Sequence, residues 1–176
     1  MRKICLWLAV FILTAAGGCS RPPIRDGDKF PRMVFYDAVG KKVGIYDYAG
    51  PDRLLLIHFW GAACCMTYSE PTIRAVAGVH AGREFDNVAV VSVNLDYKES
   101  RVRRIRQKMG PGHPLFNDRD GCFYKAYPKL RYFFPMSLIL LVDEEGIIRG
   151  HIMGPQLLPA ISDLIRRSQI PRGDKS

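Results

Sequence analysis

Residues 54–67, LLLIHFWGAACCMT, decide the class of fold. Leu54 to Trp60 is a continuous apolar run interrupted only by His58, which is typical of a strand buried on both faces of a sheet. After a short glycine-containing connection, helical spacing extends from about Cys64 to Ala81. The stretch therefore predicts a buried strand that turns directly into a helix.

The same two signals recur along the rest of the chain. We expect an opening hairpin over 33–46, strands over 88–95, 115–117, 138–142 and 147–153, and helices over 100–110, 122–127 and 157–168. Ser100 is the expected N-cap of the helix that Gly110 ends, and Pro71 is expected to kink the helix after Cys64. Strands that alternate with helices and close on an antiparallel hairpin indicate a single α/β domain with right-handed crossovers.

Composition and charge narrow the class of protein. The 176 residues are 48% hydrophobic and 24% charged, which excludes a disordered or collagen-like chain. The net charge of +9 comes from 26 Lys+Arg against 17 Asp+Glu, but no basic stretch is interleaved with exposed aromatic residues, so we expect no nucleic-acid binding. The arginine-rich segment 101–108 is expected to be a solvated helix face, the alternative being contact with anionic lipid headgroups.

The N-terminus carries an export signal. Arg2 and Lys3 precede an apolar run from Ile4 to Ala16, which is shorter than the ~20 residues of a membrane-spanning helix. The small residues before Cys19 resemble a bacterial lipoprotein cleavage site, although Ala16 stands where such sites usually carry Leu. We expect a lipoprotein-type signal peptide over 1–18, a lipidated Cys19 in a tether over 19–28, a domain over 29–170 and a flexible tail over 171–176. An ordinary signal or an uncleaved anchor is the alternative.

Export leaves three thiols in the domain: Cys64, Cys65 and Cys122. Cys64 lies where the buried strand turns into a helix, and the free N–H groups and dipole of a helix N-terminus favour a thiolate. The alternative is that Cys64 is a small core residue.

The segment from Phe59 to Thr67 resembles the active-site segment of exported thioredoxin-like proteins of the TlpA/ResA type, which is Phe-Trp-Ala-x-Trp-Cys-x-x-Cys. The likeness covers about residues 28–168, through the opening hairpin, the core strands, an Asp-Gly turn before a short helix, and a last hairpin with an Asp-x-x-Gly turn. The resemblance implies a thioredoxin-like fold, a central mixed sheet flanked by helices with an N-terminal β-hairpin extension. It also implies thiol–disulfide exchange.

The sequence departs from the family's motif at the active-site positions. Cys64 matches the first cysteine of the motif, but Thr67 stands in place of the second and Ala63 in place of the tryptophan. Glu70 matches the family's glutamate, whereas Pro71 comes one residue earlier than the family's proline. Threonine cannot release a mixed disulfide, although its hydroxyl can hydrogen-bond the Cys64 thiolate.

Two other thiols are candidates for the resolving role. Cys65 is adjacent to Cys64, and a disulfide between neighbours closes a strained ring. Cys122 is the better candidate if its Cα lies within ~4.4–6.8 Å of that of Cys64, its alternative being a half-buried thiol beside Phe123. Glu70 is a candidate proton acceptor for the thiol, or else an exposed helix carboxylate.

Trp60 and Pro135 are expected to line the groove that receives the client protein. Pro135 is the candidate for the family's cis-proline, yet it lies eight residues before Asp143 where the family has about six. Either a bulge absorbs two residues, or Ser137 takes the place and the cis-proline is absent.

No cofactor and no metal are expected. The cysteines and the four histidines do not have the spacing of metal ligands, and Thr67 follows Cys64 instead of preceding it as in peroxidase sites. The sequence thus predicts a monomeric, membrane-anchored thiol–disulfide oxidoreductase-like protein that acts on protein thiols or disulfides of exported proteins. A non-catalytic binding or chaperone-like module of the same fold is the alternative.

Overall fold

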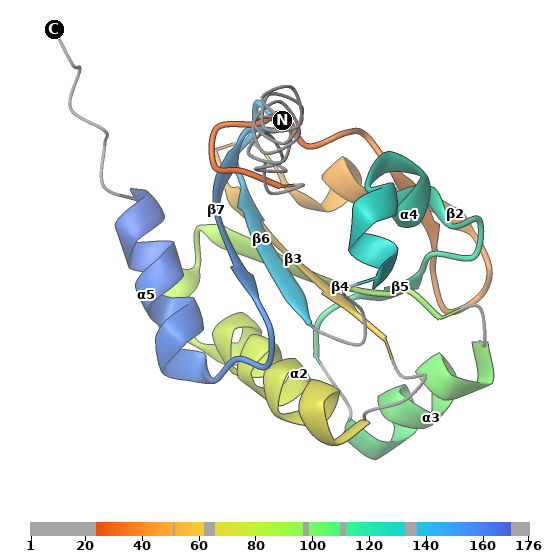
Figure 1. Cartoon of the computed structure of the whole chain (residues 1–176). Helices are drawn as coiled ribbons and strands as arrows, with labels where there is room; N and C mark the ends of the chain where they lie inside the picture. Colours follow the sequence, from red (N-terminus) through yellow and green to blue (C-terminus); the bar gives the residue numbers. More distant parts are fainter. Residues whose placement is uncertain are drawn as a thin grey trace, which may run out of the picture.

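The computed structural model of the chain describes residues 24–50, 52–61, 66–96, 99–109, 112–132 and 137–169. They form a seven-stranded sheet in the order β2-β1-β5-β4-β3-β6-β7, with helices on both faces (Figure 1). The strands are β1 (Val34–Tyr36), β2 (Lys42–Gly44), β3 (Leu54–Trp60), β4 (Val88–Asn94), β5 (Leu115–Asn117), β6 (Leu138–Val142) and β7 (Ile148–Met153). The helices are α2 (Met66–Ala81), α3 (Glu99–Met109), α4 (Cys122–Ala126) and α5 (Leu158–Gln169). Three short 3-10 helices are η1 (Ile45–Tyr48), η2 (Arg83–Phe85) and η3 (Pro128–Tyr132).

β3 is an interior strand of the sheet. It pairs in parallel with β4 from Leu54↔Val88 to Trp60↔Asn94 and antiparallel with β6 on its other side. Only Leu54 of β3 is not fully buried, and every residue of β4 is buried. The buried strand predicted over 54–60 is therefore confirmed, as are those over 115–117 and 138–142.

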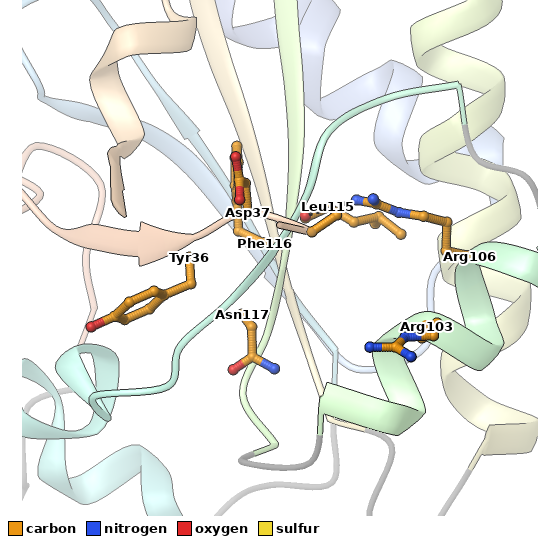
Figure 2. A pocket seen from close by; sticks show the side chains of 8 residues that line it. Tyr36, Asp37, Arg103, Arg106, Leu115, Phe116 and Asn117 are labelled. Carbon is orange, nitrogen blue, oxygen red and sulfur yellow. Dashed lines mark hydrogen bonds between the residues drawn. The ribbon is translucent and has the colours of Figure 1, made fainter. Parts of the chain in front are cut away.

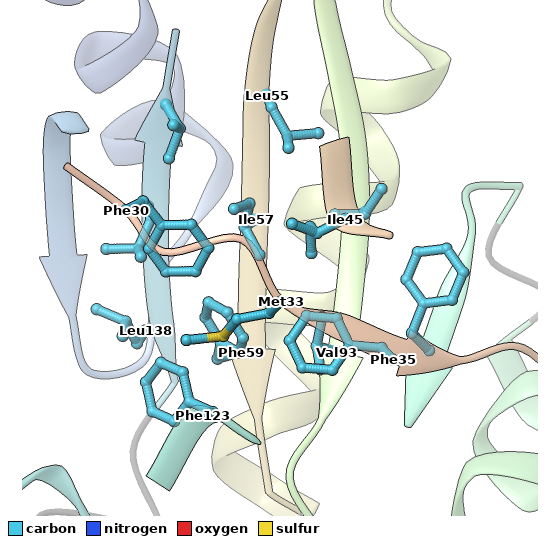
Figure 3. Close-up of a cluster of buried hydrophobic side chains, with 14 of the residues drawn as sticks. Phe30, Met33, Phe35, Ile45, Leu55, Ile57, Phe59, Val93, Phe123 and Leu138 are labelled. Carbon is cyan, nitrogen blue, oxygen red and sulfur yellow. The ribbon is translucent and has the colours of Figure 1, made fainter. Parts of the chain in front are cut away.

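Alternate residues of β3 enter two separate hydrophobic clusters. Ile57 and Phe59 point to the cluster that α4 covers, where the rings of Phe59 and Phe123 have centroids 4.3 Å apart (Figure 3). Leu56 points to the opposite cluster, which α2 and α5 cover with residues such as Val76 and Ile161. Because both faces need cover, the sheet is flanked by helices on both sides, as the sequence predicted.

The N-terminal segment packs along β7. Ile24 and Phe30 are 2% and 1% exposed, and the backbone of Ile148 bonds both Gly27 (2.7 Å) and Asp28 (2.9 Å). Residues 24–28, expected to belong to the tether, are thus held against the sheet. The expected hairpin follows as β1 and β2, with Phe35 opposite Val43.

Helix ends differ from the expectation at α3. This helix begins at Glu99, so Ser100 lies inside it and the prediction of Ser100 as N-cap is wrong. An N-cap at Ser100 would start the helix at residue 101, and the observed helix starts two residues earlier. The 3-10 helices were not predicted because three to five residues are too few to show a period.

None of the helices in the described part of the chain combines the length and apolar character needed to cross a membrane. The expected signal peptide, the lipidation site Cys19 and the tail over 171–176 lie outside the described residues.

A chain of buried polar side chains lies on the α2 side of the sheet. His58 Nδ1 is 3.2 Å from Ser92 Oγ, which is 2.8 Å from His113 Nε2. The ring of His113 lies 5.9 Å from that of His80 on α2. Burial lowers the pKa of His58 from 6.5 to about 3 and that of His113 to about 4, with smaller contributions from His113 and His80 respectively. Both imidazoles are therefore neutral in the folded protein at neutral pH.

These pKa values predict acid-sensitive stability. The unfolded chain protonates both histidines near pH 6.5, whereas the folded chain does so only near pH 4 and pH 3. The stabilisation is complete above pH 6.5 and is lost as the pH falls toward 4, by up to about 1.4 kcal/mol per pH unit for each histidine. We expect His113→Gln, which can keep the bond to Ser92, to reduce this slope by about one proton.

Urea unfolding at several pH values between about 4.5 and 8 measures the slope. The unfolding free energy at about pH 8 separately reports any loss of packing in His113→Gln, since histidine is neutral there in both states. Equal slopes for the wild type and the variant would contradict the assignment.

Candidate functional site

The candidate site lies at the carboxyl end of the parallel strands. Because β3, β4 and β5 run parallel, their carboxyl ends meet at one edge of the sheet. Trp60, Asn94 and Asn117 are the last residues of these strands and lie in register across them. Cys64 follows Trp60 by four positions and precedes Met66, the first residue of α2, by two.

The side chain of Asn94 links the ends of β3 and β4 by hydrogen bonds. Its Nδ2 donates to the carbonyl of Trp60 at 3.4 Å, and its Oδ1 accepts the N–H of Asp96 at 3.0 Å. Backbone bonds from Leu95 to the Trp60 carbonyl (2.8 Å) and from Asp118 to the Asn94 carbonyl (2.9 Å) extend the pattern beyond the strands. The chain thus leaves β3 from a fixed point.

Trp60 does not line a groove. Its side chain is fully buried and packs with Ile73 of α2 and Ile105 of α3. The expectation that Trp60 faces a client is therefore corrected, because both helices cover the indole. Its Nε1 has no acceptor within the described part of the chain.

Several predicted site residues fall where the structure gives no description. Cys64, Cys65 and Pro135 lie outside the described residues. Thr67 is the second residue of α2, so it stands in the first turn of a 16-residue helix. That turn carries backbone N–H groups without intrahelical acceptors and the positive end of the helix dipole.

Glu70 lies one turn into α2 and forms an ion pair along the helix. Its Oε1 is 2.8 Å from Arg74 Nη2, and its side chain is 24% exposed against 61% for Arg74. The ion pair orients the carboxylate toward the next turn of α2. A role for Glu70 as proton acceptor stays a prediction.

Cys122 begins α4 and is half-buried against the cluster on the face opposite α2. Its backbone N–H donates to Asp118 Oδ1 at 2.7 Å, and that of Phe123 donates to Asp118 Oδ2 at 3.0 Å. Asp118 therefore caps α4 in the way that a helix N-terminus favours.

The surroundings of Cys122 disfavour its thiolate. Burial raises the pKa of the Cys122 thiol, and the carboxylates of Asp118 and Asp120 raise it further. A thiol with a raised pKa is largely protonated at neutral pH and is then a poor nucleophile. These findings fit a half-buried thiol beside Phe123 better than a resolving thiol.

Two site residues were missed in the sequence, Asn94 and Asn117. Each ends an otherwise apolar strand with a buried amide, and that ending is the signal that could have revealed them. Within the described ranges, no three or more His, Cys, Asp or Glu side chains are grouped so as to hold a metal ion.

Comparison with known proteins relates this geometry to a family. A family model described as the AhpC/TSA family matches residues 27–151. No relative is found among curated proteins.

Solved structures share the fold at low sequence identity. A protein from Chlorobium tepidum assigned as the thiol:disulfide interchange protein DsbE is 20% identical, with a TM-score of 0.65 over 82% of this chain and 98% of its own. The thioredoxin domain of a thiol-disulfide oxidoreductase from Bacteroides vulgatus is 18% identical, with a TM-score of 0.61 over 81% and 99%. StoA from Bacillus subtilis is 17% identical, with a TM-score of 0.59 over 77% and 96%. The likenesses confirm the thioredoxin-like fold.

The electrostatics of Cys122 predict its reactivity. In a Cys64→Ser, Cys65→Ser background, we expect Cys122 to react with iodoacetamide more slowly than free cysteine at about pH 7, because its thiolate is scarce. Asp120→Asn removes one of the carboxylates that raise the pKa and should speed the reaction.

Labelling followed by peptide mass spectrometry measures both rates. Glu145→Gln is the matched control. It removes one carboxylate from the exposed turn before β7 and should leave the rate of labelling of Cys122 unchanged. Labelling of Cys122 as fast as free cysteine would contradict the raised pKa.

Proposed function

The chain belongs to the AhpC/TSA family, and from that membership we propose that it is a thiol–disulfide oxidoreductase-like protein with Cys64 as its nucleophile. One observation carries the proposal: β3, buried and fixed at its end, leads within five residues to the N-terminus of α2, and Cys64 stands in that interval.

The position supplies a physical reason for reactivity. A cysteine at a helix N-terminus meets free N–H groups and the positive end of the dipole, which favour the thiolate. The thiolate is the form that attacks a disulfide. Thr67, three residues on, has a hydroxyl that can donate a hydrogen bond to the Cys64 sulfur.

The proposed exchange uses one thiol of the protein. The Cys64 thiolate attacks a sulfur of the client's disulfide, forms a mixed disulfide and releases the other client sulfur as a thiolate. An external thiol of the glutathione or dithiol-protein class then attacks the mixed disulfide. That step regenerates the Cys64 thiolate and leaves the disulfide between the client and the external thiol.

The described residues favour an external resolving thiol over an internal one. Cys122 packs on the face opposite α2, and its pKa is raised by burial and by two carboxylates. A disulfide from Cys64 to Cys65 would close a strained ring. Thr67 has no sulfur to offer.

We propose that the protein acts outside the cytoplasm on protein thiols or disulfides of exported proteins. The N-terminal run from Ile4 to Ala16 and Cys19 support export and a lipid anchor. The domain is proposed to act as a monomer.

A second candidate is a non-catalytic binding module of the same fold. The observation in its favour is Thr67, which replaces the thiol needed for a dithiol cycle. In this case Cys64 is a packing residue without exchange chemistry.

Trapping of glutathione tests whether Cys64 is the nucleophile. After equilibration of the protein in a glutathione redox buffer, we expect mass spectrometry without reduction to find glutathione on Cys64 and no internal disulfide. Cys64→Ser should abolish the adduct, whereas Cys65→Ser and Cys122→Ser, the matched controls, should keep it.

Other outcomes assign other functions. A Cys64–Cys122 or Cys64–Cys65 disulfide would mean a two-thiol cycle with a displaced resolving cysteine. A Cys64 that stays free at every redox ratio would exclude exchange and leave the binding module.

A further inference from the structure

A groove opens where β1 separates from β5. The two strands pair only at Tyr36↔Asn117, after which the chain turns away through residues 37–41 toward β2. Two adjoining hollows of about 50 and 230 Å³ lie in the gap and share the residues Asp37, Ala38, Arg106, Leu115 and Phe116. Together they form one groove along β5, with α3 on its far side (Figure 2).

One half of the groove is polar. Asn117 is 5% exposed, and its Oδ1 accepts no hydrogen bond from any residue that the structure describes. Arg103 extends from α3 toward Asn117, and Arg106 extends toward Leu115 (Figure 2). Arg106 Nη2 donates to the carbonyl of Leu115 at 3.2 Å, on the open edge of β5. Asn117 Oδ1 is enclosed and offers a ligand no acceptor, so the two arginines supply the donors that face the groove.

The charge of this half is positive. The carboxylate of Asp37 also lines it, but its Oδ1 accepts the N–H groups of Val39 (2.9 Å) and Lys41 (2.8 Å) and is held in the turn. Arg103 has no acidic partner among the residues described. The groove therefore attracts a carboxylate.

The other half is apolar. It is lined by Val39, Tyr48, Pro114 and Phe116, and the rings of Tyr48 and Phe116 have centroids 5.1 Å apart. Val39 is 87% exposed at the rim of the hollow and is therefore open to contact with a ligand. A ligand that also carries an apolar side chain would cover it.

We propose that this groove binds an extended acidic peptide segment. A Glu or Asp side chain of the peptide pairs with Arg103, and a nearby apolar side chain packs on Val39 and Tyr48. Leu115 to Asn117 is a strand of three residues, so the groove takes a segment of about three to five residues at ~3.3 Å each.

A peptide fits the groove better than a lipid headgroup does. A flat anionic bilayer would contact the exposed arginines of α3 alike, Arg104 as much as Arg103. Arg103 lines the groove and Arg104 does not. The ring pair of Tyr48 and Phe116 lines the groove, where a flat membrane surface would leave it unused.

The groove opens at the edge of the sheet where β3 ends. Asn117 ends β5, at the same edge of the sheet where β3 ends, two strand spacings or ~10 Å away. If the proposed function holds, an acidic segment bound here would hold a client at the edge of the sheet from which the chain continues to Cys64; this consequence rests on that function, whereas peptide binding does not.

Fluorescence anisotropy with two labelled hexapeptides tests the site. Each contains one Glu and one Leu separated by two residues, in the two possible orders, and is titrated with the full-length chain carrying Cys64→Ser. We expect saturable binding of one order, weakened about tenfold by Arg103→Gln, as for loss of one charge-assisted hydrogen bond. Arg104→Gln, the matched control on the same helix, should leave affinity unchanged, and Glu→Gln in the peptide should weaken it as Arg103→Gln does.

Three results would overturn the proposal. One is no saturable binding of either peptide, and another is an equal loss with Arg103→Gln and Arg104→Gln, which means non-specific charge. The third is binding to phosphatidylglycerol vesicles that both variants weaken alike, with none to peptide, which means a membrane surface. Arg103 is exposed, so its variant should fold, and circular dichroism checks this. Because Cys64 is absent from this assay, its outcome is independent of the glutathione test.

Discussion

The parallel pairing of β3 with β4, in register from Leu54↔Val88 to Trp60↔Asn94, positions the rest of the molecule. Two parallel neighbours require a crossover long enough to return the chain, and α2 provides it on one face of the sheet. Side chains of β3 alternate between the faces, so the other face needs cover as well. The N-terminal segment and α4 supply it, with Phe123 packed on Phe59.

The same pairing places the candidate site residues at one edge of the sheet. Asn94 joins the ends of β3 and β4 through its amide, so the chain that carries Cys64 leaves the sheet from a fixed point. Beyond β5, acidic and basic side chains lie on opposite faces of the sheet. Asp118 lies on the α4 side, where with Asp120 it raises the pKa of Cys122, whereas Arg103 and Arg106 reach in from α3 on the other side. A thiolate is thus disfavoured on the face where Cys122 lies, and an anion is attracted on the opposite one.

Patterns within one segment predicted most of the fold. The apolar runs over 54–60 and 138–142 are strands with the expected bounds, because a strand buried on both faces must be apolar throughout. Predictions failed where a residue's surroundings come from distant segments. Trp60 is buried by α2 and α3 together, and residues 24–28 are held by β7, neither of which local composition reports.

The same distinction between local pattern and tertiary contact applies to the candidate site. The sequence by itself determined the class of fold, the junction of buried strand and helix that contains Cys64, and the replacement of the second cysteine by Thr67, because each is a property of adjacent residues. Only the tertiary structure decided that carboxylates surround Cys122, that Asn94 fastens the strand ends, and that Tyr36, Arg103 and Asn117 enclose one groove. Pairing of strands and packing of helices bring those residues together from distant parts of the chain, and no local pattern encodes their distances.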